Sequence, residues 1–236
     1  TRPGFFTTQT LQKAVAFVVL IALLAFFSAF ASNFATGANM VGIMQATAVN
    51  GVLGVAVTFV IISGGIDLSV GTMMTLTAVM AGIILTNLGM PLPIGILGAI
   101  ASGAFMGAIS GATIAKLKIP PFIATLGMMQ IARGLALVFS GAKPIYFNDT
   151  PNYGLLSPES TISKLIPGVE IPNGVMIMFI VAIIASIVLN RTIIGRMIFA
   201  LGSNEEAARL SGINVDRWKI LTYAISGGIC GIAGLI

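Results

Sequence analysis

The sequence of 236 residues contains no histidine, a single cysteine and few charged residues. The missing histidine excludes a Ser-His-Asp triad and a histidine-based metal site, and the lone Cys230 excludes an internal disulfide. No Gly-Lys-Ser or Gly-Lys-Thr occurs, so the chain lacks a Walker A loop and any ATP it uses is hydrolysed by a partner. Charged residues make up 8% of the chain, against about 25% in soluble domains, and hydrophobic residues 57%. The composition therefore excludes a soluble globular protein, and the net charge of +5 is too sparse for binding nucleic acid.

Long uncharged runs predict an all-α fold, a polytopic transmembrane helix bundle with about seven spans. A helix needs about 20 apolar residues to cross the roughly 30 Å hydrocarbon core of a bilayer. The run 14–66 suits two spans divided near 32–39, and the run 68–115 suits two more, divided at 87–93 by Gly89 and two prolines. Three further spans are expected at about 121–141, at 174–190, and from 219 to the last residue.

The distribution of Lys and Arg predicts a cytoplasmic N-terminus, because basic residues concentrate in the cytoplasmic loops of membrane proteins. With seven alternating spans, residues 142–173 form an insert on the outer side and residues 191–218 form a cytoplasmic loop. Most bases then lie inside: Arg2, Lys13, Lys116, Lys118, Arg191, Arg196, Arg209, Arg217 and Lys219. The first span is too long for a signal peptide and is expected to remain as an anchor. Because Ile236 ends an apolar, glycine-rich pattern, we expect the single transmembrane domain of residues 1–236 to be C-terminally incomplete.

Small residues recur every four positions in the expected fourth span. They are Gly95, Ala99, Gly103, Gly107, Gly111 and Ala115. In lipid, such a ridge lets the backbone of a neighbouring helix approach closely. We interpret it as a packing surface inside the bundle, and a substrate path along the ridge is the alternative.

Polar, uncharged side chains within the spans are candidates for the path of a neutral, hydroxyl-rich substrate. They are Gln45, Thr47, Asn50, Thr58, Thr75, Thr77 and Gln130, and the amides Gln45, Asn50 and Gln130 are the ones assigned to the path. Amides can exchange hydrogen bonds with a polyol, but they also bond across helices for about 0.6 kcal/mol each. Both interpretations stay open.

Two charged residues at membrane depth need a partner, water or a functional reason, because an ionisable group there is costly. Asp67 follows the helix-breaking pair Gly64-Gly65 and can cap the next helix as its N-cap residue. Arg133 lies twelve residues after Pro121, which places it about 18 Å along a helix and near mid-membrane. It can pair with Asp67, bind backbone carbonyls, or face a water-filled cavity.

The outer insert of residues 142–173 is rich in proline and aromatic residues and contains several acids. It is too polar to span a membrane and long enough to form a small docking surface. An ordered loop without a partner is the alternative.

A short helix is predicted in the middle of the cytoplasmic loop. Residues 203–206, Ser-Asn-Glu-Glu, match a capping box with Ser203 as the cap, good helix formers follow, and Gly212 ends the helix after about two turns. Physical chemistry alone leaves two interpretations: a solvated loop helix or a helix lying on the lipid surface.

Three segments, in order along most of the chain, resemble a known family. Residues 206–208, Glu-Ala-Ala, followed by three residues and Gly212, resemble the EAA loop of ABC importer permeases, and residues 200–216 are similar to its version in ribose-type sugar permeases. Residues 64–71, Gly-Gly-Ile-Asp-Leu-Ser-Val-Gly, resemble a signature of that family, and residues 125–134 resemble its segment before the large outer loop.

This resemblance implies the permease subunit of an ABC importer for a monosaccharide, a ribose-like pentose or a hexose, in the bacterial inner membrane. The subunit would not be an enzyme and would bind no cofactor or metal itself. It would pair with a second permease, identical or similar, over two cytoplasmic ATPase subunits that bind ATP and Mg²⁺, and would receive sugar from a soluble binding protein.

The resemblance also assigns residues. The coupling helix that docks in a groove of the ATPase would be Asn204, Glu205, Glu206, Ala207, Ala208, Arg209, Leu210, Ser211, Gly212 and Ile213, with Glu205, Glu206 and Arg209 making its polar contacts. Asp67, Ser69 and Arg133 join the three amide residues above as the candidate substrate path.

Three other functions are alternatives to sugar import by an ABC permease. An ion-coupled secondary carrier would need intramembrane carboxylates, for which Asp67 is the sole candidate. An ABC permease for a nucleoside, a signalling furanone or a branched-chain amino acid would share the architecture, and the sequence leaves the cargo open. An intramembrane hydrolase is disfavoured because isolated carboxylates without histidine offer no acid–base pair.

Overall fold

The computed structural model describes residues 8–147, 150–156, 161 and 170–236, so part of the predicted insert lies outside the described residues. The chain divides into two compact units, residues 1–43 and 44–236. The first unit contains α1 (Thr8–Phe30) and the first turns of α2 (Gly37–Ile62). All further helices belong to the second unit.

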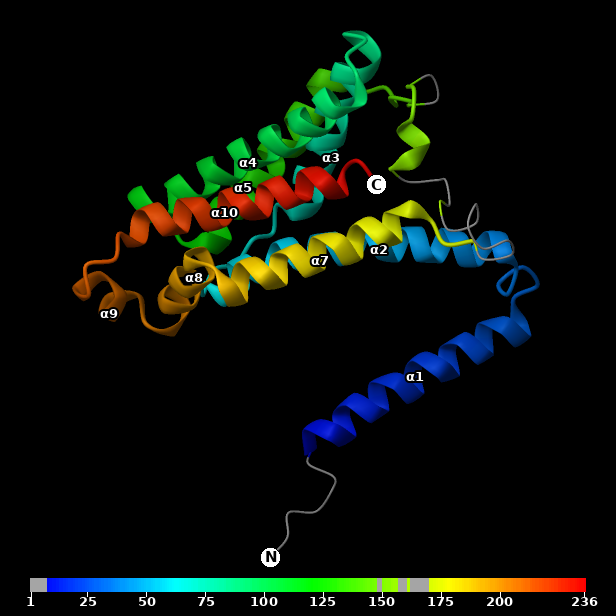
Figure 1. Cartoon of the computed structure of the whole chain (residues 1–236), viewed down its shortest axis with the longest axis horizontal. Coiled ribbons are helices and arrows are strands. Elements are labelled where there is room, and N and C mark those ends of the chain that lie inside the picture. The colour runs from blue at the N-terminus through cyan, green and yellow to red at the C-terminus, as the bar shows by residue number, and fades with distance from the viewer. Residues whose placement is uncertain (1–7, 148–149, 157–160, 162–169) are drawn as a thin grey trace, which may run out of the picture. The chain divides into compact units, whose positions relative to one another are not determined.

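The second unit is built from helices joined mostly by short loops (Figure 1). In chain order after α2 they are α3 (Val70–Gly82), the π-helical turn η1 (Ile83–Asn87), α4 (Leu92–Lys116), α5 (Pro121–Ser140), the 3₁₀ turn η2 (Tyr153–Leu155), α7 (Asn173–Arg191), α8 (Ile193–Ser203), α9 (Glu205–Leu210) and α10 (Val215–Ala233). No strand occurs in the described part of the chain. The predicted all-α class is confirmed.

Within the described residues, five helices are long and apolar enough to cross a membrane. They coincide with five of the predicted spans: Gly37–Ile62, Val70–Asn87, Leu92–Lys116, Pro121–Ser140 and Asn173–Arg191. The other two predicted spans correspond to α1, with a described apolar stretch of Ala14–Phe30, and to α10, which carries three charged residues in its first turns. A polytopic helical bundle is therefore confirmed, and the number of seven spans stays a prediction.

Proline and glycine set several helix ends. Pro121 occupies the first turn of α5, where its missing N–H costs nothing. The same helix ends at Gly141 in the left-handed conformation, with φ of 61°, and the next N–H, of Ala142, donates to the carbonyl of Leu137 at 2.9 Å. Between α2 and α3, Gly64 has φ of 78°, so the predicted break at the paired glycines is confirmed.

The predicted ridge of small residues on α4 packs against α10, and the two helices run alongside each other (Figure 1). A Cβ atom added to Gly103 would overlap the carbonyl oxygen of Gly227, and one added to Gly107 would overlap that of Tyr223. From α10, a Cβ on Gly231 would lie 2.5 Å from the carbonyl oxygen of Ala99. The packing interpretation of the ridge is confirmed, because α10 fills the surface that a substrate path would need.

A central cluster of buried side chains joins five helices, from α2 to α5 and α10. Its members are Ala56, Met73, Leu76, Met106, Met128, Ala132, Ala136 and Cys230. On another side of α2, Val52 packs with Val181 of α7, and Phe59 packs with Ala185 of α7 and Ile198 of α8. The lone cysteine is therefore a core residue, and α8 is part of the bundle.

Replacing Gly103 with alanine should destabilise the bundle, because the new methyl group meets backbone of α10 that cannot rotate away. Overpacking of this kind costs about 1–3 kcal/mol. The measurement is the free energy of unfolding in detergent. Gly54→Ala in α2 is the matched control, because nothing lies within 4 Å of its added Cβ. Equal stability of the two variants would contradict the close contact.

Candidate functional site

The segment between α7 and α10 folds into two helices, of which the prediction contained only the second. α8 begins after Thr192, whose hydroxyl accepts a hydrogen bond from the N–H of Gly195 at 3.5 Å. The signal for it was present in the sequence: the buried Ile198 and Leu201 lie on one face, three residues apart. α9 has six residues, which is shorter than the two turns expected.

The predicted capping box is wrong. Asn204, not Ser203, is the N-cap of α9, and its Oδ1 accepts from the N–H of Ala207 at 2.9 Å. Ser203 is still the last residue of α8, where its hydroxyl donates to the carbonyl of Ala200 at 3.0 Å. Because α8 was missed, the extended backbone that a cap requires was assigned one residue too early.

The predicted end of the helix at Gly212 is confirmed. Gly212 has φ of 82°, and its N–H donates to the carbonyl of Arg209 at 3.1 Å. The next N–H, of Ile213, donates to the carbonyl of Ala208 at 3.1 Å. These two bonds form a Schellman motif, which needs the left-handed conformation that glycine adopts without strain.

α9 has a buried face and an exposed face. Ala208, 6% exposed, packs with Leu201 of α8 and Val215 of α10 in a small apolar cluster. On the opposite face Glu206 is exposed and Leu210 is 85% exposed.

Ion pairs tie α9 to α10 and to the α4–α5 loop. The Nζ of Lys219 lies 2.6 Å from Oε2 of Glu205, and the guanidinium of Arg209 lies 3.3 Å from the carboxylate of Asp216. Lys118 reaches that same carboxylate oxygen at 3.3 Å, and Arg209 lies 3.6 Å from Oε1 of Glu205. Glu205 and Arg209 are thus engaged within the chain.

Glu206 is the acidic residue of α9 that forms no ion pair within the described part of the chain. The partners of the other two charges, Asp216 and Lys219, were absent from the predicted site, as was Lys118, which pairs with Asp216. Nothing in the sequence marked them, because Asp216 and Lys219 lie on a separate helix and Lys118 lies in the loop between α4 and α5.

The pKa of the Asp216 carboxyl reflects this network. Slight burial raises it, but hydrogen bonds from Lys118 and Arg209 and their positive charges outweigh burial, so the pKa of Asp216 lies below its usual value. A carboxyl with a depressed pKa stabilises the fold above its unfolded pKa of about 3.9, and this contribution is lost as the pH falls through the folded pKa. The network is therefore intact at neutral pH.

The Gly-Gly-Ile-Asp segment forms a non-helical linker of residues 63–69 between α2 and α3. Asp67 was predicted to be the N-cap of α3, and this prediction is wrong because Ser69 takes that position. The side chain of Asp67 is buried, at 7% exposed. The carboxylate of Asp67 accepts from the N–H of Ser69 at 2.9 Å and from its hydroxyl at 2.6 Å. The hypothesis of an Asp67–Arg133 ion pair is wrong: none joins these two described residues, and Arg133 is exposed.

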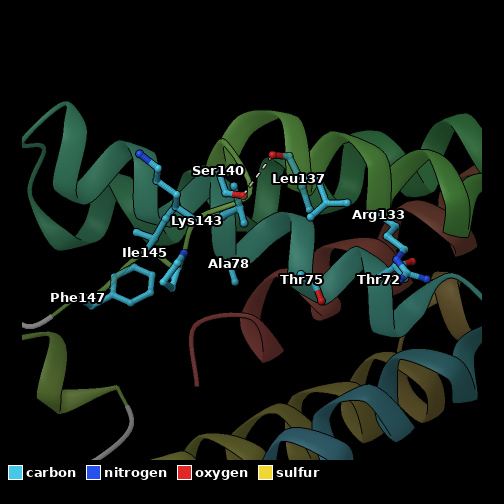
Figure 2. A pocket seen from close by; sticks show the side chains of 12 residues that line it. Thr72, Thr75, Ala78, Arg133, Leu137, Ser140, Lys143, Ile145 and Phe147 are labelled. Atoms are coloured by element: carbon cyan, nitrogen blue, oxygen red, sulfur yellow. Dashed lines mark hydrogen bonds between the residues drawn. The ribbon is translucent and has the colours of Figure 1, made fainter.

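Arg133 instead lines a groove between α3, α5 and the start of the insert (Figure 2). The groove has a volume of about 490 Å³, within the range of small-molecule sites. Arg133 lies beside Thr72 at one end, and Lys143 and Phe147 lie toward the other (Figure 2). Thr75 and Ser140 add hydroxyl groups along the wall.

The other predicted path residues do not line this groove. Gln130 is exposed on α5, one turn from Arg133, while Asn50 is exposed on α2 and Gln45 is half-buried there. Asp67 and Ser69 are buried in the linker. Of the lining hydroxyls, Thr75 was among the polar span residues noted in the sequence, whereas Thr72 and Ser140 were missed, although two threonines three residues apart on α3 are a usable signal for a shared helix face.

Residues 39–236 match the family described as "Branched-chain amino acid transport system / permease component". Among curated proteins, the ribose import permease protein RbsC of Escherichia coli (strain K12) is 38% identical over 232 residues, which are 98% of this chain and 71% of that protein. No solved structure matches the chain.

Two further relatives carry other sugars in their names. The fructose import permease protein FrcC of Rhizobium meliloti is 36% identical over 217 residues, which are 92% of this chain and 60% of that protein. The L-arabinose transport system permease protein AraH of Escherichia coli (strain K12) is 35% identical over 219 residues, 93% of this chain and 64% of that protein.

Asp216→Asn should loosen α9, because it removes the charge that holds Arg209 and Lys118. Each exposed ion pair contributes about 0.2–1 kcal/mol, so amide exchange of residues 205–212 should rise about two- to tenfold. Hydrogen exchange at pH 7 with mass spectrometry measures it. Arg217→Gln, a neighbouring charge outside the network, is the control. Unchanged exchange in Asp216→Asn would show that the network does not order α9.

Proposed function

Because this chain belongs to the family of branched-chain amino acid transport system permease components, we propose that it is the permease subunit of an ABC importer that translocates a monosaccharide. The family description names amino acids, but the relatives at 35–38% identity are named for ribose, fructose and L-arabinose. The proposal that the cargo is a sugar rests on those relatives. ATP is hydrolysed on a separate subunit, which also holds Mg²⁺, and this chain binds neither.

One observation supports the coupling role: α9 is held in place by the rest of the chain, while its outward face is exposed. Its buried face and its two paired charges hold it in place, so Glu206, Ala207 and Leu210 are left to contact a partner. A helix fixed in this way can transmit a push, whereas a free six-residue helix is unstable in water. We place a cytoplasmic ATPase subunit on this face.

The translocation path is proposed to run along the face of α5 that carries Arg133. Gln130 and Arg133 are exposed there, and nothing lies within 4 Å of a Cβ added to Gly127 or Gly134. An arginine about 18 Å into a membrane helix is too costly to face lipid, so this face borders water or protein. A second permease subunit across a water-filled path satisfies both conditions.

The proposed orientation rests on the distribution of basic residues. By the positive-inside rule, the loop that carries α9 and the N-terminus both face the cytoplasm, in a bacterial inner membrane. The insert of residues 142–173 lies at the opposite end, where a soluble binding protein delivers the sugar. The groove beside Arg133 opens toward this insert, because Lys143 and Phe147 line it.

Leu210→Asp should weaken docking of the ATPase, because burying an apolar side chain of this size contributes about 1.5–3 kcal/mol. The affinity of the ATPase for the full-length permease should fall by about tenfold or more, and sugar-stimulated hydrolysis with it. Leu210→Met, which keeps an apolar side chain of similar volume, is the control. Wild-type affinity in Leu210→Asp would remove the coupling role of this face.

Arg133→Leu should lower sugar uptake in reconstituted vesicles by about tenfold to a hundredfold, because a hydrogen bond to a charged group contributes about 1.5–3 kcal/mol. ATPase binding should be unchanged, since Arg133 lies far along α5 from the α9 end. Arg133→Lys keeps the charge and should retain part of the uptake. Full uptake in Arg133→Leu would place the path elsewhere.

A further inference from the structure

The linker of residues 63–69 is partly enclosed by the bundle: Ser63, Asp67 and Ser69 are buried, whereas Gly64, Ile66 and Leu68 are exposed. The hydroxyl of Tyr223 donates to the carbonyl of Ile66 at 3.1 Å. Tyr223 follows Val215, the first residue of α10, by eight positions, which corresponds to about 12 Å along the helix. Unwound backbone at membrane depth has to be enclosed by protein or border water, because lipid cannot bond its polar groups. Such a break is also a place where a helix pair can move.

The end of α8 forms one wall of the linker. A Cβ added to Gly202 would overlap the carbonyl oxygen of Ile62 and would lie 3.4 Å from the backbone nitrogen of Gly64. A Cβ added to Gly64 would in turn lie 3.8 Å from the Cα of Gly202. The backbones of α8 and of the linker are thus in direct contact, with no side chain between them.

α10 forms the opposite wall. A Cβ added to Gly65 would lie 2.6 Å from the hydroxyl oxygen of Tyr223 and 2.9 Å from Cγ1 of Val60. Tyr223 is 2% exposed and packs with Val60 and Ile114. The linker is therefore held between Gly202 on α8 and Tyr223 on α10.

Both walls are joined to α9. Gly202 lies two residues before Asn204, the single residue between α8 and α9. On the other wall, Lys219 of α10 pairs with Glu205 of α9, one helical turn before Tyr223. A displacement of α9 consequently moves both walls of the linker.

The far end of the linker leads to the groove. Ser69, fully buried, bonds Asp67 and occupies the N-cap position of α3. One turn later Thr72 lies beside Arg133 in the groove (Figure 2). Movement of the linker therefore changes the position of the helix that forms one side of the groove.

We propose that Gly202 and Tyr223 are positioning residues that transmit the movement of α9 to the 63–69 linker and through it to α3. Packed elements with two discrete arrangements can carry such a displacement when each nucleotide state favours one of them. This inference rests on the proposed coupling of α9 to an ATPase. It adds the segment that receives the displacement, which is the non-helical linker of residues 63–69.

The test is hydrogen exchange with mass spectrometry on the full-length permease assembled with its ATPase, with and without a non-hydrolysable ATP analogue. In the wild type, the ATPase should protect residues 205–212, and the analogue should change exchange in residues 63–69. Tyr223→Phe removes one hydroxyl and should reduce the nucleotide-dependent change, and the sugar imported per ATP hydrolysed, by about threefold to tenfold. Protection of residues 205–212 should remain.

Tyr153→Phe is the matched control, because it also removes one hydroxyl bonded to a backbone carbonyl, that of Leu235 at 3.1 Å, away from α9. Gly202→Ala is a second variant and should uncouple in the same way. Protection of residues 205–212 without any nucleotide effect on residues 63–69 in the wild type would overturn this inference alone. So would a Tyr223→Phe variant that behaves like Tyr153→Phe. No protection of residues 205–212 would overturn the proposed docking itself.

Discussion

The close contact between α4 and α10 is the constraint on which the rest of this structure depends. Glycine on both helices, as at Gly103 and Gly227, lets the backbones touch, so α10 has one position along α4. α10 then presents Tyr223 to the linker and, two turns earlier, Asp216 to α9. In lipid, where apolar surface alone does not drive helices together, such direct backbone packing gives the bundle its rigidity.

α9 illustrates how a helix too short to be stable alone becomes a firm element. Asn204 and Gly212 satisfy its terminal backbone groups, and Ala208 buries its inner face. Its charged residues Glu205 and Arg209 face the chain's own ions, so they serve the order of the helix. Contact with a partner is left to the side chains of α9 that are exposed and form no ion pair within the described part of the chain.

Two features conflict with what a bilayer tolerates, and they meet at the start of α3. Residues 63–69 leave backbone unwound between α2 and α3, and Arg133 places a charge on an exposed helix face. Thr72 connects them, because it follows the linker by one turn and lies beside Arg133. Departures from local rules are expected at functional sites, and here Arg133 lines the groove while the linker leads into α3, which forms one side of it.

Hydropathy and small-residue spacing in the sequence determined the five spans, the ridge on α4 and the stop at Gly212, because each depends on residues close together along the chain. Only the tertiary structure decided that Asp67 bonds Ser69, and that Lys118 meets Asp216, 98 residues away. A linear pattern fixes which face of a helix is apolar. It does not fix which charges lie within 4 Å once the helices have packed, and that choice determined how the predicted coupling helix is held.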